Sequence, residues 1–263
     1  MNSINVPVAA SANNDCATSY FTKRVCDKIF SRVSSSPFIK APFPCFQVNR
    51  LFDLNLYSQF IQHLPEDSAY FKSREGRTSN PYALQSRKTL CVTDPEQLSG
   101  IREDQRQFWK EVGEFFSSQE FTTELFRHYL PYLKCRYDSL SFETNTRVDL
   151  TRDTTGYRIF PHTDSPSKIF TAIIYLPKEP FNLDLGTSIY VPDRPLVSEH
   201  SHHFKPEEQT FTELHRAPYS AGTMFSFMKT NNSFHGREPI ETQGVERNLI
   251  IITVQHKNKF IGA

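Results

Sequence analysis

The sequence predicts an α+β protein in which a mainly helical amino-terminal half packs on one sheet of a carboxy-terminal double-stranded β-helix, a jelly-roll or cupin-like core. Two observations predict this fold class. Apolar residues recur at helical spacing up to about residue 134 and at every second position beyond residue 135. The chain also has 23 phenylalanines and 17 prolines but only 9 glycines, a composition that suits many short strands with tight exits.

The same pattern divides the chain into an amino-terminal arm, residues 1–36, and a single domain, residues 37–263. The arm begins polar, becomes amphipathic and ends at Ser34-Ser35-Ser36-Pro37, so it either stays mobile or docks on the body as a helix. Within the domain, residues 37–134 are expected to be mainly helical support, and residues 135–258 to form the jelly-roll core.

Three helices are expected in the supporting half. The first ends before Pro65, the second contains Trp109, and a capping box at Ser117-Ser118-Gln119-Glu120 opens the third. A cluster of aromatic residues in the last two helices would suit a ligand cage, but its helical spacing favours a hydrophobic core. The members of this cluster are Phe108, Trp109, Phe115, Phe116 and Phe121.

Short strand-like runs follow in the carboxy-terminal half, separated by turns that contain Pro, Gly and Asp. The runs cover residues 157–162, 169–176, 187–191, 223–228 and 248–255. Upstream of them, apolar Leu140, Phe142, Val148 and Leu150 alternate with polar residues and indicate a further strand. Short strands at this spacing are typical of a sandwich or a jelly roll.

Charge and cysteine usage exclude several classes of protein. Lys and Arg number 30 against 29 for Asp and Glu, and this net charge of +1 gives no basis for nucleic-acid or membrane partners. No apolar run approaches the roughly 20 residues that span a bilayer, and the amino terminus lacks a signal-peptide pattern. The five scattered cysteines form no CxxC pair, which predicts reduced thiols and a cytoplasmic location.

A His-x-Asp motif lies at the end of the first run. His162 and Asp164 are two residues apart, so on an extended segment both side chains point the same way. An imidazole and a carboxylate placed in this way suit neighbouring positions on a small metal ion. Taken alone, the motif more often describes a surface histidine hydrogen-bonded to a nearby aspartate.

Two residues further along the chain strengthen the metal interpretation. His235 follows the run 223–228, where an opposing strand would supply a third ligand. Two histidines and one carboxylate form the facial triad that suits Fe(II) and O₂ chemistry. Arg247 opens the apolar run 248–254, and an inward-pointing arginine there needs an anionic partner such as a ligand carboxylate.

The order His-x-Asp, distal His and then Arg resembles the Fe(II)/2-oxoglutarate-dependent dioxygenases, particularly their prolyl-hydroxylase-like branch, over about residues 140–256. The resemblance implies that His162, Asp164 and His235 hold the iron. It also implies that Tyr175 and Arg247 grip the distal carboxylate of 2-oxoglutarate.

Two further positions bear on this resemblance. Thr171 lies two strand steps from Tyr175 and would line the same pocket. The branch usually has Gly-Gly at the strand that begins near Gly186, where this chain has a single glycine, and this departure weakens assignment to any one subfamily.

The implied reaction uses O₂ as co-substrate and converts 2-oxoglutarate to succinate and CO₂ while a C–H bond of the substrate is hydroxylated. Asp164 argues against the halogenases of the family, which replace this carboxylate with a small residue. We expect a small polar metabolite, such as an amino acid or a derivative, as substrate. The alternatives are a prolyl-type protein hydroxylase, an iron oxidase or cyclase that does not need 2-oxoglutarate, and a metal-free jelly-roll binding module. The sequence leaves the oligomeric state open.

Strand parity gives weaker candidates for substrate contacts. Arg158 and Phe160 share parity with His162 and are expected on its face, although Arg158 would equally pair with Asp153. Arg237, two residues after His235, is either a pocket cation or part of a salt bridge at the rim. Arg147 and Asp149 share a face that either lines the cavity mouth or is solvated.

A histidine cluster remains outside this set. His200, His202 and His203 lie in a long stretch rich in Pro and Ser, which favours solvated histidines on a loop. Such a loop would be able to act as a lid over the site.

Overall fold

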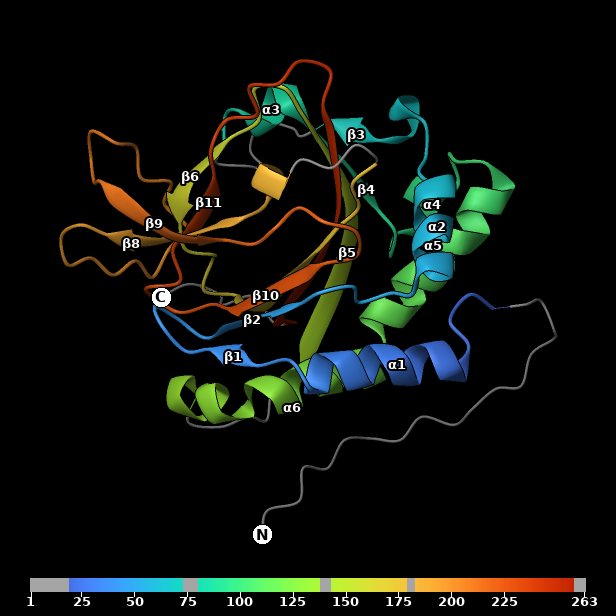
Figure 1. Ribbon diagram of the computed structural model, residues 1–263, viewed down its shortest axis with the longest axis horizontal. Helices are drawn as coiled ribbons and strands as arrows, with labels where there is room; N and C mark the ends of the chain where they lie inside the picture. The colour runs from blue at the N-terminus through green and yellow to red at the C-terminus, as the bar shows by residue number, and fades with distance from the viewer. Residues whose placement is uncertain (1–18, 73–79, 138–142, 179–182, 258–263) are drawn as a thin grey trace, which may run out of the picture.

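The computed structural model describes residues 19–72, 80–137, 143–178 and 183–257, and within them two antiparallel sheets pack together (Figure 1). The larger sheet contains, in order of pairing, β1 (Phe38–Ile39), β2 (Cys45–Val48), β10 (Met224–Met228), β7 (Lys168–Tyr175), β12 (Glu246–His256), β5 (Thr144–Thr154), β4 (Arg87–Cys91) and β3 (Phe71–Lys72). The smaller sheet contains β6 (Ile159–His162), β11 (His235–Arg237), β8 (Ser188–Pro192) and β9 (Phe211–Arg216).

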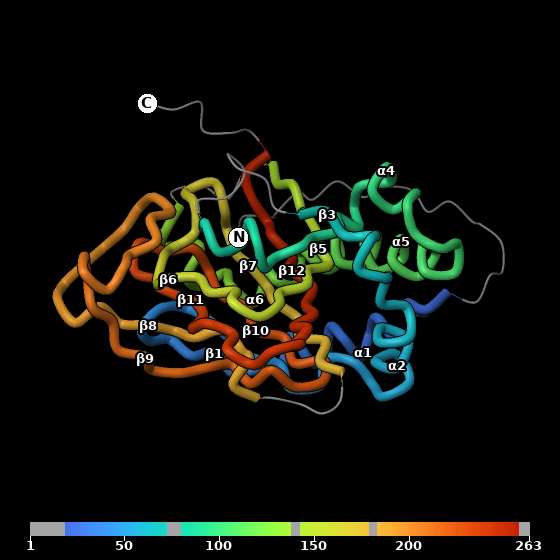
Figure 2. Tube along the Cα trace, turned by 90° about the horizontal axis from the view of Figure 1, so that it is seen from above, coloured from blue at the N-terminus to red at the C-terminus, as the bar shows by residue number. Residues whose placement is uncertain are grey.

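Helices cover one end of the larger sheet and the face of it that points away from the smaller sheet. They are α1 (Lys23–Ser34), α2 (Leu54–Gln62), α3 (Ala83–Ser86), α4 (Pro95–Leu98), α5 (Glu103–Ser117) and α6 (Gln119–Arg136), with single 3₁₀ turns η1 (Asp67–Ala69) and η2 (Leu183–Leu185). Figure 2 shows α2, α4 and α5 at one end of the molecule and the smaller sheet at the opposite end. The expected mixture of helices and antiparallel sheets is therefore confirmed. Within the described residues, no helix combines the length and the apolar character that a membrane span requires.

The outer face of the larger sheet packs against these helices. Side chains at even positions of β5 and β12, such as Leu150 and Ile252, are fully buried there. The aromatic cluster of α5 and α6 meets them, and Phe108, Trp109 and Phe116 are also fully buried. The prediction that this cluster forms core is thus confirmed.

The cap of α6 differs slightly from the predicted capping box. Ser118, not Ser117, is the N-cap residue, and its hydroxyl accepts a 3.1 Å hydrogen bond from the Phe121 amide. Glu120 consequently lies in the first turn, where its charge favours the positive end of the helix dipole. The helix itself begins where the sequence indicated.

The described part of the predicted arm is docked on the body. Ile29 and Val33 of α1 are buried, and the Phe21 ring stacks on Phe115 with ring centres 4.6 Å apart. Residues 1–18 of the arm, and Leu140 and Phe142 of the predicted strand, lie outside the described residues.

Strands also occur in the half that was expected to be mainly helical. β2 pairs with β10, and β4 pairs with β5, so residues before 134 extend the larger sheet at both edges. β9 was not predicted either, because its residues do not alternate regularly between polar and apolar and lie on an exposed edge strand. These strands gain their hydrogen bonds from distant parts of the chain, which local periodicity does not reveal.

The inner face of the larger sheet is ordered in rows, because directly paired residues share a face. From one end of β12 to the other, charged residues lie at the two ends of this face and mainly apolar ones in the middle. The rows are Arg147–Thr253–Thr171, then Asp149–Ile251–Ile173, then Thr151–Leu249–Tyr175, and finally Arg87–Asp153–Arg247.

Candidate metal centre

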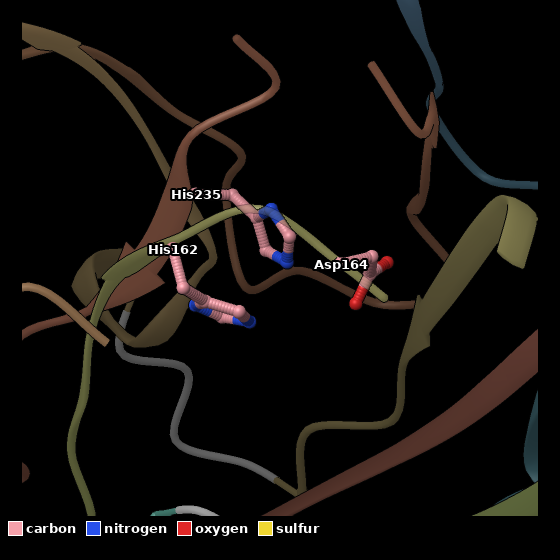
Figure 3. Close-up of side chains that lie close together, drawn as sticks. All are labelled: His162, Asp164 and His235. Atoms are coloured by element: carbon pink, nitrogen blue, oxygen red, sulfur yellow. The ribbon is translucent and has the colours of Figure 1, made fainter. Parts of the chain in front are cut away.

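Three side chains that the sequence marked as metal ligands come together between the two sheets. His162 ends β6 and pairs directly with His235 at the start of β11, while Asp164 follows two residues after His162. One potential ligand atom from each residue lies within 4.8 Å of the others, and the three side chains converge in Figure 3. Their exposed fractions are only 5%, 5% and 6%, so little water reaches them.

Hydrogen bonds fix the orientation of both imidazoles. His162 Nδ1 lies 3.0 Å from the Phe160 carbonyl oxygen, and His235 Nδ1 lies 2.9 Å from that of Ser233. Because a carbonyl oxygen only accepts, each Nδ1 carries the proton and each Nε2 keeps a free lone pair. Metal-bound histidines are commonly oriented in this way.

The carboxylate of Asp164 is held from two sides. Lys168 Nζ donates to Oδ1 at 2.7 Å, and Thr171 Oγ1 donates to Oδ2 at 2.8 Å. Burial alone would raise the pKa of Asp164, but Lys168 and the two histidines outweigh it and lower the pKa below its usual value. Asp164 is therefore ionised at neutral pH.

Burial lowers the pKa of both His162 and His235, so these imidazoles are neutral. Two neutral imidazoles and one carboxylate with converging lone pairs are the donor set of a facial triad, which suits Fe(II) and leaves adjacent coordination positions open. The residues present therefore fit a bound metal ion.

A cavity of about 930 Å³ extends from the triad across the inner face of the larger sheet. His162, Asp164 and Lys168 lie in its wall, as do Arg147 and Asp149. Arg147 binds the Asp149 carboxylate through two hydrogen bonds of 2.7 and 2.8 Å. The pair thus lies in the cavity wall while Arg147 is also half exposed to solvent, so both interpretations left open for it hold in part.

Arg158 and Phe160 do not share the face of His162, contrary to the parity argument. His162 pairs with His235 but Ile159 pairs with Arg237, so β6 advances three residues while β11 advances two. This β-bulge reverses the parity, and Ile159 lines the cavity instead.

Arg158 and Phe160 contact each other outside the cavity wall. The guanidinium carbon of Arg158 lies 4.1 Å above the Phe160 ring centre. The alternative pairing of Arg158 with Asp153 is not formed either, because Asp153 binds other arginines.

Arg247 points inward as expected, but a protein carboxylate already neutralises it. Its Nη1 donates to Asp153 Oδ2 at 2.6 Å, and Asp153 also receives two hydrogen bonds of 2.6 and 2.8 Å from Arg87. Tyr175 lies close by, with its ring centre 5.8 Å from the Arg247 guanidinium carbon, and its hydroxyl accepts from the Thr187 amide.

Arg237 is a second buried guanidinium in the same interior. It shares a face of β11 with His235 and is only 5% exposed, yet its Nε and Nη1 have no hydrogen-bond partner among the described residues. Burial, and then the neighbouring Arg247 and Arg216, lower its pKa to about 10. Arg87 and Arg247 both bind the single carboxylate of Asp153, and Arg237 lies near Arg247, so this region has an excess of positive charge.

His203 is a site residue that the sequence analysis placed among solvated loop histidines, and this interpretation is wrong for His203. It lines the cavity, and its ring centre lies 4.5 Å from that of His162. Burial, with a smaller effect from His235, lowers its pKa to about 4. His202 of the same cluster is largely exposed and bonded to Glu208, as the loop interpretation expected. Only the path of the loop distinguishes the two histidines, and no local pattern marks it.

The comparisons with known proteins give structural matches alone. No protein-family model matches the sequence, and no curated protein does. Among solved structures, a 2OG-Fe(II) oxygenase family oxidoreductase from Burkholderia pseudomallei is 11% identical, with 88% of this chain and 89% of that one covered at a TM-score of 0.44.

Two other solved structures show a similar degree of likeness. A prolyl-4-hydroxylase from Pseudomonas putida is 10% identical, covering 89% of this chain and 100% of its own at a TM-score of 0.46. HygX from Streptomyces hygroscopicus, with nickel, 2-oxoglutarate and hygromycin B bound, is 12% identical, covering 90% and 88% at 0.46. At these scores the side chains of the site, and not the overall likeness, have to identify the chemistry.

Proposed function

We propose that this protein is a non-haem Fe(II)/2-oxoglutarate-dependent oxygenase that hydroxylates a C–H bond of a small polar molecule. The observation that carries the proposal is the combination, in one interior, of a facial triad and a buried guanidinium with two nitrogens that find no partner within the described part of the chain. The triad supplies a site for Fe(II), and the guanidinium supplies an anchor for an anionic co-substrate.

His162, Asp164 and His235 would hold the metal through two Nε2 atoms and one carboxylate oxygen. Bound Fe(II), together with 2-oxoglutarate and O₂, supplies the oxidising chemistry. Lys168 and Thr171 orient the Asp164 carboxylate, and this contact is the role that we assign to Thr171. The low exposure of the triad excludes bulk water from the reacting centre.

The charge of the interior supports a dianionic co-substrate. Burying an unpaired guanidinium is costly, and the three arginines around Asp153 carry an excess of two positive charges. One carboxylate of a dicarboxylate such as 2-oxoglutarate would offset part of this excess, while its other carboxylate would bind the metal. Arg237 is two residues from His235 on the same face of a strand, about 7 Å along its axis, a span that suits a five-carbon diacid between metal and guanidinium.

This assignment refines the anchor that the resemblance implied. Arg247 and Tyr175 lie next to the proposed carboxylate position, but Arg247 is already bound to Asp153. We assign the free N–H donors to Arg237 and a flanking position to Arg247 and Tyr175. The sequence suggested Arg237 as a candidate substrate contact, and its burial beside the triad favours the co-substrate role.

The wall of the cavity supports a small polar substrate with groups of both signs, such as an amino acid or a derivative. Away from the triad the wall contains both basic and acidic side chains, and Lys168 is shared with Asp164. The basic side chains are Lys72, Arg87, Arg147 and Lys168, of which Arg87 is bound to Asp153, and the acidic ones are Asp94, Glu96 and Asp149. A substrate with one strongly dominant charge would find no matching surplus here.

The fold supports the same proposal. We assign the eight strands β5–β12 to a double-stranded β-helix. They form two four-stranded sets, β10-β7-β12-β5 and β6-β11-β8-β9, and the chain passes from one set to the other at every step except from β8 to β9. Residues 37–263 would then be one catalytic domain with residues 37–134 as support. A cytoplasmic location stays a prediction; the four described cysteines form no disulfide with one another.

The experiment is an anaerobic titration of the metal-free protein with Fe(II) and then 2-oxoglutarate, followed by visible absorption. A weak charge-transfer band that appears only with 2-oxoglutarate, and is absent in His235→Ala, is the expected result. His215→Ala removes an exposed histidine and serves as the matched control, which should keep the band. Iron binding without the band would indicate an oxidase or cyclase, and no iron binding would leave a metal-free binding module.

The substrate class is tested after the band is established. Release of succinate is measured with a panel of free amino acids and, in parallel, with proline-containing peptides. Turnover of free amino acids supports the proposal, whereas turnover of peptides alone replaces it with a prolyl-type protein hydroxylase.

A further inference from the structure

The chain between β8 and β9, residues 193–210, crosses the strand that carries the metal ligands. The Ser198 carbonyl oxygen accepts a 2.8 Å hydrogen bond from Thr163 Oγ1, and Thr163 lies between His162 and Asp164. Further on, the Phe204 amide donates to the Pro161 carbonyl oxygen at 3.0 Å. Residues 199–203 are therefore fastened at both ends to the His-x-Asp segment.

A buried lysine contacts both partners of the hydrogen bond between Ser198 and Thr163. Lys229 is 1% exposed, and its ammonium donates to Ser198 O at 3.2 Å and to Thr163 Oγ1 at 3.3 Å. The Thr230 carbonyl and the Asn231 side chain complete its set of oxygen partners. A buried ammonium is costly unless oxygens surround it, so this one specifies the positions of the groups that it binds.

The result is that His203 is held beside the triad without belonging to it. Its ring makes an edge contact with His162 at 4.5 Å between ring centres, and it lies in the cavity wall together with Ser201. The group of residues whose ligand atoms converge contains His162, Asp164 and His235 but not His203. The two ring nitrogens of an imidazole each donate or accept a hydrogen bond, depending on which of them carries the proton.

We propose that His203 is a specificity-determining residue that hydrogen-bonds the ligand on the open side of the metal, and that Lys229 is the positioning residue that holds it there. This inference rests on the proposed metal site. Small anions and oxygen-bearing groups are the class of ligand that would be recognised, since they are able to bind a metal and pair with an imidazole at once. An aliphatic group would gain nothing from His203.

The first test uses the protein loaded with Co(II) and titrated with azide, which reports binding at an open metal position by a change in the visible spectrum. His203→Phe keeps a ring but removes both hydrogen-bonding atoms. We expect the affinity for Co(II) to stay within about two-fold and that for azide to fall roughly 2- to 12-fold, the effect of one neutral hydrogen bond. His202→Phe, on the exposed side of the same loop, is the control and should bind azide normally.

Two results would overturn the assignment of His203. Unchanged azide affinity in His203→Phe would show that His203 does not contact the ligand. A loss of Co(II) affinity of tenfold or more would show that His203 is a fourth metal ligand instead.

The second test addresses Lys229. Lys229→Met should loosen residues 198–204, which hydrogen exchange would detect, and should weaken azide binding as much as His203→Phe does. Because both changes act through one contact, the double variant should be no weaker than either single variant. Thr163→Val removes the neighbouring fastening and serves as a second variant if Lys229→Met fails to fold. Wild-type azide affinity in these variants would contradict the positioning role.

The outcomes also separate this inference from the proposed function. If the wild-type protein does not bind Co(II), the proposed metal site itself is wrong. If it binds Co(II) and azide but His203→Phe behaves as wild type, the metal site stands and only the role of His203 is wrong.

Discussion

The two faces of the larger sheet are built from the same strands but serve different ends. On the face that meets the helices, β5 and β12 present Val148, Leu150, Ile250 and Ile252, all fully buried among aromatic rings. On the face that meets the smaller sheet, the alternate residues include charged and hydroxyl groups. The helix-covered face therefore stabilises the fold through apolar burial, whereas burying polar groups along the inner face lowers its stability.

The difference shows how function is placed in a fold with a two-residue period. The sequence of a strand buried on both faces is a nearly continuous apolar run only where both faces belong to the hydrophobic core. In β12 the outward residues are apolar without exception from Ile250 to Val254, whereas the inward set begins with Arg247. The charged positions are concentrated where the cavity and the proposed co-substrate position lie.

The largest expected effect is on the inner face. Asp153→Ala would leave Arg87 and Arg247 buried without their carboxylate, and we expect the free energy of unfolding to fall by roughly 3–5 kcal/mol. Urea denaturation measures it. Asp149→Ala is the matched control, because its ion pair with the half-exposed Arg147 should contribute only about 1 kcal/mol or less. Similar losses in both variants would mean that the inner face does not depend on the Asp153 cluster.

The corresponding change on the outer face should affect stability alone. Phe116→Ala opens a cavity in the helix-covered core and should cost about 3–5 kcal/mol of unfolding free energy. Affinity for Co(II), measured at a temperature where the variant is folded, should stay as in wild type. A large loss of metal affinity would show that the two faces are not independent.

A smaller stability loss with a large effect on the site is expected at Gly236, between His235 and Arg237. A Cβ there would lie 2.7 Å from the Ile159 carbonyl oxygen and 3.1 Å from the Tyr190 ring. Gly236→Ala should therefore push β11 away from β6, at a cost of about 1–3 kcal/mol, and weaken metal binding at least tenfold. Gly100→Ala, whose nearest contact would be 3.8 Å, is the control for a glycine with room. Normal metal affinity in Gly236→Ala would contradict the tight pairing of these strands.

The smallest effect is a dependence on pH. Burial lowers the pKa of Lys229 to about 8 from a usual value of 10.5. Between these two pH values the unfolded chain binds more protons than the folded one, so stability rises with pH. Relative to Lys229→Met, wild type should gain about 1 kcal/mol between about pH 7.5 and pH 9 in urea denaturation. Parallel pH profiles for the two proteins would show that Lys229 titrates normally.

The sequence was informative where the signal is local. His162 and Asp164 are joined by strand geometry, and His235 follows a recognisable apolar run, so the three were identified before the structure placed them together. Helices α5 and α6 were likewise predicted from their aromatic periodicity. The face of a strand residue was predictable only as long as the strand was regular, and the bulge in β6 reversed the expectation for Arg158 and Phe160.

The other features of the site depend on which distant segments of the chain come into contact. Arg247 was expected to pair with an anion. Its actual partner, Asp153, is determined by the register between β12 and β5, and neither strand encodes that register by itself. The unpartnered state of Arg237 is visible only once the other carboxylates are assigned. His203 enters the site because residues 193–210 fold back over β6, a path fixed by Lys229 and by backbone hydrogen bonds.

Arg237 is buried without a hydrogen-bond partner for its Nε and Nη1 among the described residues, and we attribute this to its role as the anchor of a co-substrate carboxylate. The most direct measurement is the affinity of the Fe(II)-loaded protein for 2-oxoglutarate under anaerobic conditions, compared between wild type and Arg237→Met. Arg216→Met, which removes a guanidinium bound to Glu213, is the control. We predict a loss of roughly 30-fold or more for Arg237→Met, with a metal-free protein at least as stable as wild type. Equal affinity for 2-oxoglutarate in Arg237→Met and wild type would contradict the claim.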